Sequence, residues 1–135
     1  MYSEIFKLRD CGFLKISTVT LWKEPFSAVL KNLGLSENAK HLREIDIELA
    51  QEIVSKILWK DLAYGSELMS EGKASSFAGR IIEDYVNDDC VIYTNGTWER
   101  GELKGWNPMT GSTFDSGVII KHPDYCSCIW VEDED

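Results

Sequence analysis

Residues 113–131 of this 135-residue chain read TFDSGVIIKHPDYCSCIWV, and this stretch decides the expected fold. Both of its halves are rich in strand-forming residues, and His122-Pro123-Asp124 between them is a turn sequence. We therefore predict two antiparallel strands, at residues 113–121 and 125–131. The second is expected to be an edge strand, available for pairing with a copy of itself or with a partner.

The same β character continues upstream to residue 90. Residues 90–94 and 97–103 favour strands, and Asn95-Gly96 between them is a strong two-residue hairpin signal. Residues 105–111 are rich in turn formers and predict a loop. Four sequential strands with short links predict an antiparallel meander.

Two longer helices are expected before this β part. Residues 45–64 and 71–86 place their apolar side chains on one helical face, and Gly65 is a stop signal for the first helix. Asp61 falls within the apolar stripe of that first helix, close to its end. Its carboxylate is either held by backbone amides of the following loop or presented to something basic.

The first third of the chain gives weaker signals. Pro25 and Gly34 are start and stop signals for a short helix over residues 25–33. Residues 5–8 and 13–22 predict extended segments, although the periodicity of the second segment leaves a helix open.

Helices followed by strands predict an α+β fold, with two to three helices packed on one face of a mainly antiparallel sheet. We expect a single domain over residues 1–135, since this length buries enough surface for a core of its own. Its helical part would span about 25–86 and its β part about 90–131. An acidic tail would follow at residues 132–135.

The charge is strongly one-sided. The chain has 14 basic and 23 acidic residues, for a formal net charge of -9, and nearly all of the excess lies after residue 68. Such a field repels nucleic acid and anionic lipid and favours the docking of a basic partner, although solubility alone would also explain it. No apolar run of signal-peptide or membrane-span length is present in the sequence, so a cytoplasmic protein is expected.

Familiar catalytic and metal-binding motifs are absent from the sequence. Cys126 and Cys128 form a C-x-C pair, but the spacing of the remaining cysteines and histidines does not suit a zinc site, so the four cysteines are expected to be reduced core thiols. Neither His41 nor His122 adjoins a nucleophile elbow, and no phosphate-binding or dinucleotide-binding loop occurs. We expect no metal, no cofactor and no catalytic residues.

Four stretches, at residues 61–65, 93–96, 114–120 and 128–135, resemble the small immunity proteins encoded beside bacterial polymorphic and contact-dependent growth-inhibition toxins. The resemblance covers the C-terminal two thirds of the chain. It implies a cytosolic antidote that binds one cognate toxin domain, often a basic nuclease, and blocks its active site or substrate groove.

The leading hypothesis is therefore a non-catalytic inhibitor whose acidic β half meets a basic toxin surface, with aromatic anchors among the carboxylates. The candidate contact residues are Asp61, Asp88, Asp89, Trp98, Glu99, Trp106, Asp115, Glu132, Asp133, Glu134 and Asp135. The alternative is a small-molecule-binding or enzymatic α+β domain, with a pocket built from Asp61, Asp115 and a histidine. A nucleic-acid mimic is a third hypothesis, and a homodimer through the edge strand also stays open.

Overall fold

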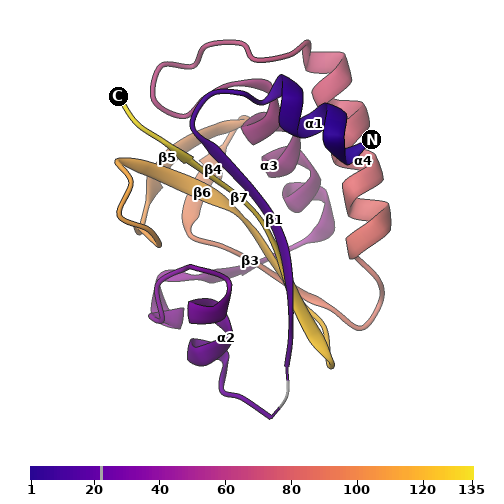
Figure 1. Cartoon of the computed structure of the whole chain (residues 1–135), viewed down its shortest axis with the longest axis vertical. Helices are drawn as coiled ribbons and strands as arrows, with labels where there is room; N and C mark the ends of the chain where they lie inside the picture. Colours follow the sequence, from indigo (N-terminus) through magenta and orange to yellow (C-terminus); the bar gives the residue numbers. More distant parts are fainter. Residues whose placement is uncertain (22) are drawn as a thin grey trace.

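The computed structural model describes residues 1–21 and 23–135, and a five-stranded antiparallel sheet lies at its centre (Figure 1). The strands of this sheet are β1 (Phe13–Thr20), β2 (Arg43–Ile45), β3 (Val91–Thr94), β6 (Phe114–Lys121) and β7 (Tyr125–Asp133). Their order across the sheet is β1-β7-β6-β3-β2, and a separate hairpin contains β4 (Gly96–Glu99) and β5 (Glu102–Trp106). The predicted α+β fold with a mainly antiparallel sheet is confirmed.

Strands β6 and β7 form the centre of the sheet because their apolar side chains are buried on both faces. Val118 lies opposite Ile129 in one core cluster, while the neighbouring Ile119 lies opposite Cys128 in the other. A strand that is buried on both faces belongs inside a sheet. The prediction that residues 125–131 form an edge strand is therefore wrong, since β7 lies between β1 and β6.

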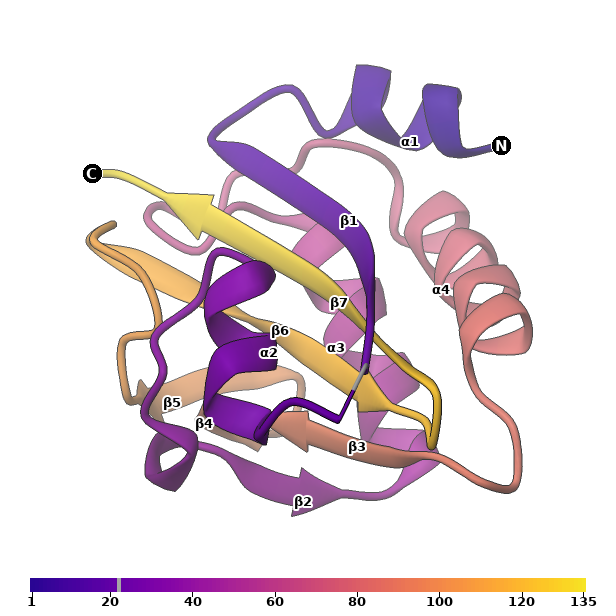
Figure 2. The same ribbon diagram turned by 60° about the horizontal axis from the view of Figure 1, so that its bottom comes forward.

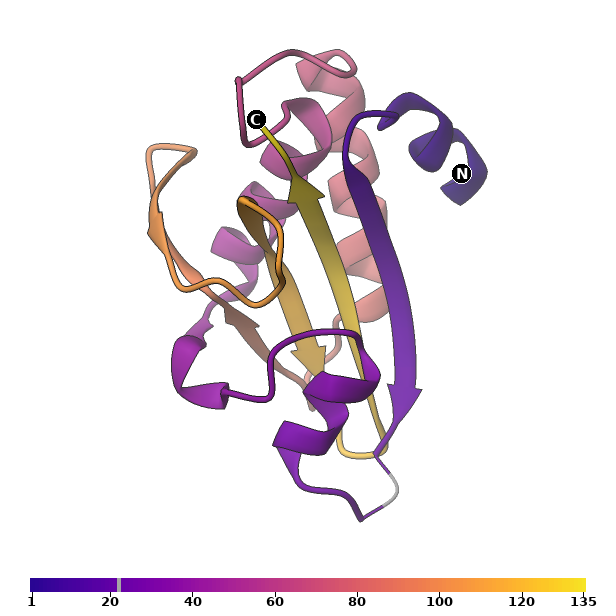
Figure 3. The same ribbon diagram turned by 60° about the vertical axis from the view of Figure 1, so that its left-hand side comes forward.

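The helices divide between the two faces of the sheet (Figures 2 and 3). They are α1 (Tyr2–Leu8), α2 (Phe26–Asn32), α3 (Ile47–Trp59) and α4 (Glu71–Tyr85), with a short 3-10 turn at Ala39–His41. Side chains of α1, α3 and α4 share one core cluster with the sheet, and this agrees with the two to three helices expected on one face. Helix α2 packs on the opposite face through Val29 and Leu30. Among the described residues, no helix combines the length and apolar character needed to cross a membrane.

Two predictions about the helices need correction, the first about a missed helix and the second about the ends of α3. Residues 5–8 were expected to be extended, but they belong to α1, which is anchored by the buried side chain of Ile5. Helix α3 is shorter than the predicted 45–64, because Asp46 caps it at the start and Ile45 pairs with Ile92 of β3. It ends at Trp59, before a turn that the next residues form.

The extended segment predicted at 13–22 and the helices predicted at 25–33 and 71–86 lie close to their expected positions, as β1, α2 and α4. Strand β1 covers residues 13–20 of the predicted 13–22, and Trp22 lies outside the described residues. Pro25 precedes α2 as its N-cap and is not its first helical residue.

The predicted hairpin at Asn95-Gly96 does not form. The buried side-chain amide of Asn95 donates to the carbonyl oxygens of Asn107 (2.9 Å) and Asp115 (3.0 Å), and Gly96 begins β4. The hairpin turn lies instead at Arg100-Gly101, whose φ angles of 53° and 74° are those of a type I′ turn. The single strand predicted at 97–103 is therefore wrong, because this turn divides it into β4 and β5. The chain leaves the central sheet after β3 and returns at β6, so the five strands β3 to β7 do not form the predicted four-stranded meander.

The loop predicted near the C-terminus is displaced by two residues, and the predicted acidic tail is shorter than expected. Strand β5 continues to Trp106, and the loop covers residues 107–113 instead of 105–111. Strand β7 continues through Asp133, and only Glu134 and Asp135 follow it.

Candidate partner-binding groove

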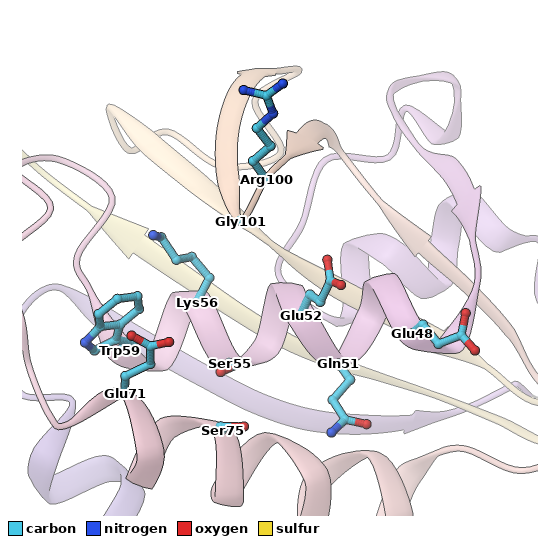
Figure 4. Close-up of a pocket in the computed structure, with 10 residues that line it drawn as sticks. All are labelled: Glu48, Gln51, Glu52, Ser55, Lys56, Trp59, Glu71, Ser75, Arg100 and Gly101. Atoms are coloured by element: carbon cyan, nitrogen blue, oxygen red, sulfur yellow. The ribbon is translucent and has the colours of Figure 1, made fainter.

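A groove of about 640 Å³ lies between α3, the start of α4 and the tip of the β4–β5 hairpin (Figure 4). Its lining residues come from these three elements: Glu48, Gln51, Glu52, Ser55, Lys56, Trp59, Glu71, Ser75, Arg100 and Gly101. Most of these side chains are exposed. The groove is therefore a surface feature, lined by residues that are far apart in sequence.

Helix α3 forms the floor of the groove because its opposite face is buried. Ile53, Val54 and Ile57 pack into the core under the sheet. With 3.6 residues per turn, this fixes the i, i+4 row of Glu52 and Lys56 on the outer face. Figure 4 shows both side chains rising from α3 toward the hairpin tip.

The three carboxylates of the groove form no ion pair within the described part of the chain, although Lys56 and Arg100 line the same groove. Among the described residues, Glu48, Glu52 and Glu71 have no cationic group within ion-pair distance. The same holds for most of the acidic residues, since only four of the 23 form an ion pair in this part of the chain. The groove therefore offers carboxylates to an incoming cation.

Trp59 supplies an aromatic surface at one end of the groove. Nζ of Lys56 lies 4.8 Å from the centre of its ring, and Nζ of Lys60 lies 4.1 Å from it. Its indole Nε1 donates to Oε1 of Glu67 at 2.9 Å. The half-buried ring already contacts two ammonium groups of the protein, so a partner's guanidinium or aliphatic stem would have to share or replace these contacts.

Arg100 overhangs the groove from the hairpin tip in a conformation that costs free energy. Its φ of 53° lies in the left-handed region, where Asn or Gly is preferred in a type I′ turn. A side chain with Cβ pays about 1 kcal/mol to adopt this conformation. Arg100 also makes no ion pair with any described residue, so nothing inside the protein explains why this strained position holds an arginine.

Four of the predicted contact residues are buried and cannot meet a partner in this structure. They are Asp61, Trp98, Asp115 and Asp133, with exposed fractions of 3%, 7%, 0% and 1%. Each of the three carboxylates holds a separate piece of the fold together. Trp98 belongs to the core under α3, and its indole N–H has no partner among the described residues.

Asp61 lies just after α3 and closes the turn that follows. Its carboxylate accepts the backbone N–H groups of Tyr64 (2.9 Å) and Ser66 (2.6 Å). The N–H of Gly65 adds a bond to the Asp61 carbonyl oxygen (3.1 Å). The sequence left two possibilities for this carboxylate, and the structure contains the first of them: backbone amides of the following loop hold it.

Asp115 ties the loop at residues 107–113 to the sheet. It accepts from Asn95 Nδ2 (3.1 Å), the backbone N–H of Met109 (3.0 Å), Thr110 Oγ1 (3.1 Å) and Trp130 Nε1 (3.2 Å). Burial raises the pKa of the Asp115 carboxyl, and the hydrogen bonds to Met109, Thr110 and Trp130 counteract part of that rise. This carboxylate is a structural acceptor that organises the loop.

Asp133 forms a buried, two-pronged ion pair with Arg9. Nη1 and Nη2 of Arg9 lie 2.7 Å and 2.8 Å from its two carboxylate oxygens. The same carboxylate accepts the N–H of Leu62 (2.8 Å), and Arg9 Nε donates to the Ile57 carbonyl oxygen (2.9 Å). The pair joins the N-terminal segment, the end of α3 and the C-terminal strand.

The exposed candidates do not form one continuous surface. Asp88 and Asp89 lie in the loop before β3, where Asp88 and Asp46 of the α3 cap line a hollow of about 310 Å³. Glu134 and Asp135 lie at the other end of the sheet. The eight-residue strand β6 separates these ends by roughly 23 Å, at about 3.3 Å per residue.

The other three candidates differ in their surroundings. Glu132 accepts from Ser112 Oγ at 2.9 Å and is half-buried. The half-buried ring of Trp106 packs on Phe114, with ring centres 5.3 Å apart. Of all the candidates, only Glu99 adjoins the groove, next to Arg100 in the hairpin.

The thiols and histidines do not converge on a reactive centre. Burial raises the pKa of Cys126 to about 12 and that of Cys128 to about 11, so both remain thiols at neutral pH. Cys11 is exposed, which corrects the expectation of four core thiols. In the described part of the chain, no three His, Cys, Asp or Glu side chains are grouped so that they could hold a metal ion.

Sequence reasoning missed the groove because its walls come from three separate segments. The sequence signal that could have located the hairpin tip is Glu99-Arg100-Gly101-Glu102, a glycine among charged residues within a β region. Comparisons with protein-family models, with curated proteins and with solved structures gave no match. The groove, its charges and its aromatic ring are the observations from which a function can be proposed.

Proposed function

We propose that this chain is the antidote of a bacterial toxin. It is a non-catalytic cytoplasmic protein that binds a cognate toxin domain of basic character, of the nuclease class, and neutralises it. The observation that carries this proposal is the groove beside α3, where three carboxylates without an ion pair lie near the half-buried ring of Trp59. This combination matches the anatomy of a protein-binding hot spot.

The charges of the chain support a basic partner. A net charge of -9 accelerates the approach of a cationic domain and disfavours nucleic acid as a ligand. Once the partner is docked, Lys or Arg side chains can lie between Glu52 and Glu71 and pack on Trp59. Steering sets the association rate, while the desolvated contacts in the groove set the lifetime of the complex.

The alternative of a small-molecule or enzymatic pocket has one observation in its favour, which is the size of the groove. About 640 Å³ falls within the usual range for ligand sites. The carboxylates first expected to form such a pocket, Asp61 and Asp115, are instead buried and occupied by backbone and side-chain donors. A pocket of this kind would have to use Glu48, Glu52 and Glu71.

The test uses as the binding partner the protein encoded immediately upstream of this gene, which the proposal expects to carry the toxin domain. We expect the wild-type chain to abolish its toxicity on co-expression and to form a tight complex whose association slows with salt. Glu48→Lys/Glu52→Lys reverses two groove charges and should slow association at least tenfold. Glu83→Lys/Asp124→Lys is the matched control, because it changes the net charge equally at exposed positions outside the groove lining.

Two results would contradict the proposal in different ways. If both double variants associate at the same reduced rate, only net charge matters and the groove is not the contact surface. If no neighbouring toxin is bound or neutralised, while a metabolite raises the melting temperature of the wild type and not of the Glu48/Glu52 variant, the groove is a small-molecule site and the antidote function is wrong.

A further inference from the structure

The border of the central sheet formed by β1 is an open pairing edge. Strand β1 has eight residues and pairs on one side only, with β7 (Figure 3). Among the described residues, no strand lies beyond it. Its outer backbone N–H and C=O groups are therefore free to pair with another strand.

Strand β1 also lacks the features that usually protect such an edge. Its only charged residue is Lys15, whose Nζ is turned back to the Leu33 carbonyl oxygen of the same molecule (2.9 Å). The strand contains no proline, and its pairing with β7 runs from Phe13 to Thr20 without a bulge. By contrast, β2 at the opposite border has three residues, two of them charged. A short, charged edge strand such as β2 disfavours pairing with another chain, whereas a long, regular and largely uncharged edge strand such as β1 favours it.

Apolar side chains accompany this edge. A hollow of about 530 Å³ follows residues 12–17, and its lining includes Phe6 of α1 and Phe13 of β1. These two rings are 44% and 55% exposed, and they are two of the four large apolar side chains that the described residues expose. Burying them would add a hydrophobic contribution to backbone pairing.

We infer that the occupant of this edge is β1 of a second copy of the chain. Two copies with a charge of -9 each repel one another over most of their surfaces. Strand β1 carries no acidic residue, so pairing of two copies of this strand places no carboxylates opposite one another, and Asp10 of the adjoining hollow precedes the strand. A basic toxin gains no electrostatic attraction from the same strand.

Symmetry restricts how the two strands can pair. Opposed residues of an antiparallel pair share one face of the sheet, so a two-fold axis must place some residue opposite its own copy. An axis at Lys15 would oppose two ammonium groups. An axis at Ile16 instead places Phe13 opposite Val19 of the second copy and Lys15 opposite Ser17. We therefore assign the axis to Ile16, which yields a continuous ten-stranded sheet.

The first test is the mass of the free protein in solution, by sedimentation velocity from micromolar to near-millimolar concentration. We expect a concentration-dependent dimer of twice 15.4 kDa. Added salt should strengthen the dimer by screening the repulsion between two acidic copies, whereas it weakens a complex with a basic toxin. Phe13→Glu should abolish the dimer, while Tyr64→Glu, an equal change at another exposed aromatic, should leave it intact.

The second test locates the axis by cross-linking, in a background with Cys11→Ser and Cys90→Ser. Ile16→Cys should form an intermolecular disulfide, because opposed Cα atoms in an antiparallel pair are about 4.5–5.5 Å apart. Ser17→Cys should not cross-link, because the shifted pairing places its two copies about 8 Å apart.

Monomers at every concentration and salt, together with no cross-link from Ile16→Cys, would overturn the inference. Hydrogen exchange of β1 amides gives a separate outcome. Protection that appears only in the complex with the toxin would assign this edge to a toxin strand, and it would refute the second copy while leaving the antidote function standing.

Discussion

Removing the negative charge of Asp133 tests whether this carboxylate holds the fold together or meets a partner. In Asp133→Asn the amide of the new side chain is a donor where Arg9 and the N–H of Leu62 both require an acceptor. The guanidinium of Arg9, which is buried, then has no counter-charge. The expected result is a large loss of stability with no specific loss of partner binding.

The size of the loss follows from the burial of both groups. Breaking a buried, hydrogen-bonded ion pair from one side costs about 3–5 kcal/mol, against a total of about 5–15 kcal/mol for an ordinary domain. With a urea dependence of about 2 kcal/mol/M, a loss of about 4 kcal/mol moves the unfolding midpoint down by about 2 M. The pair bridges the two ends of the chain, so the whole transition should shift.

The assay is urea unfolding of the wild type, Asp133→Asn and two comparison variants. Asp135→Asn is the matched control, because this carboxylate is exposed and makes no side-chain hydrogen bond or ion pair with the described residues, and it should change stability by at most about 0.5 kcal/mol. Arg9→Met/Asp133→Leu removes both charges and should recover part of the loss, because no uncompensated charge remains buried. In the absence of denaturant, folded Asp133→Asn should associate with the proposed toxin partner at the wild-type rate.

Two results would refute this account of Asp133. A loss below about 1 kcal/mol would mean that the pair is solvated in solution and only appears buried. A variant of unchanged stability that binds the toxin tenfold more slowly would return Asp133 to the contact surface, as the sequence alone suggested.

Three other consequences of the structure can be measured on the free protein. Gly117→Ala should destabilise the protein severely or prevent folding, because the new Cβ would lie 2.0 Å from the Ile129 carbonyl oxygen. Chemical denaturation measures the loss, and Gly111→Ala is the control, since a Cβ there meets no atom within 4 Å. A thiol reagent should label Cys11 rapidly in the native protein, while Cys126 and Cys128, buried and with pKa values of about 12 and about 11, should react only after unfolding; fast labelling of either would contradict the buried β7. Burial raises the pKa of Asp115 in the folded state, so the folded protein holds this proton more tightly than the unfolded chain. The contribution of Asp115 to the free energy of unfolding therefore falls as pH rises from the ordinary carboxyl range to the raised pKa, and the stability difference between wild type and Asp115→Asn should shrink over that interval. A stability difference that grows with pH would contradict the raised pKa.

The fold class could be predicted because the decisive patterns are local. The apolar runs in residues 117–120 and 128–131 indicate strands whatever lies around them, and the stripe of α4 needs only its own spacing. The order of the strands could not be predicted in this way. Strand β1 pairs with β7 across more than 100 residues of chain, and no local pattern records such a pairing.

The hairpin error shows how a tertiary contact overrides a turn preference. Asn95-Gly96 has the preferred sequence, but the Asn95 amide is engaged by Asn107 and Asp115 once β6 is in place. Arg100-Gly101 has the weaker sequence, yet it forms the turn because Trp98 and Leu103 on either side of it contact the core beside α3. The strain that remains at Arg100 became visible only with the backbone conformation.

The contact residues could be predicted only in part, because composition does not distinguish structural carboxylates from exposed ones. Asp61, Asp115 and Asp133 belong to the same acidic excess as Glu99 and differ from it only in burial. The excess charge is therefore not a measure of the binding surface. The buried carboxylates hold the end of α3, the loop at residues 107–113 and the C-terminal strand in place, and that scaffold carries the exposed carboxylates of the groove near Trp59. Replacing a buried carboxylate should therefore lower stability first, while replacing Glu48 or Glu52 should change association without changing the fold.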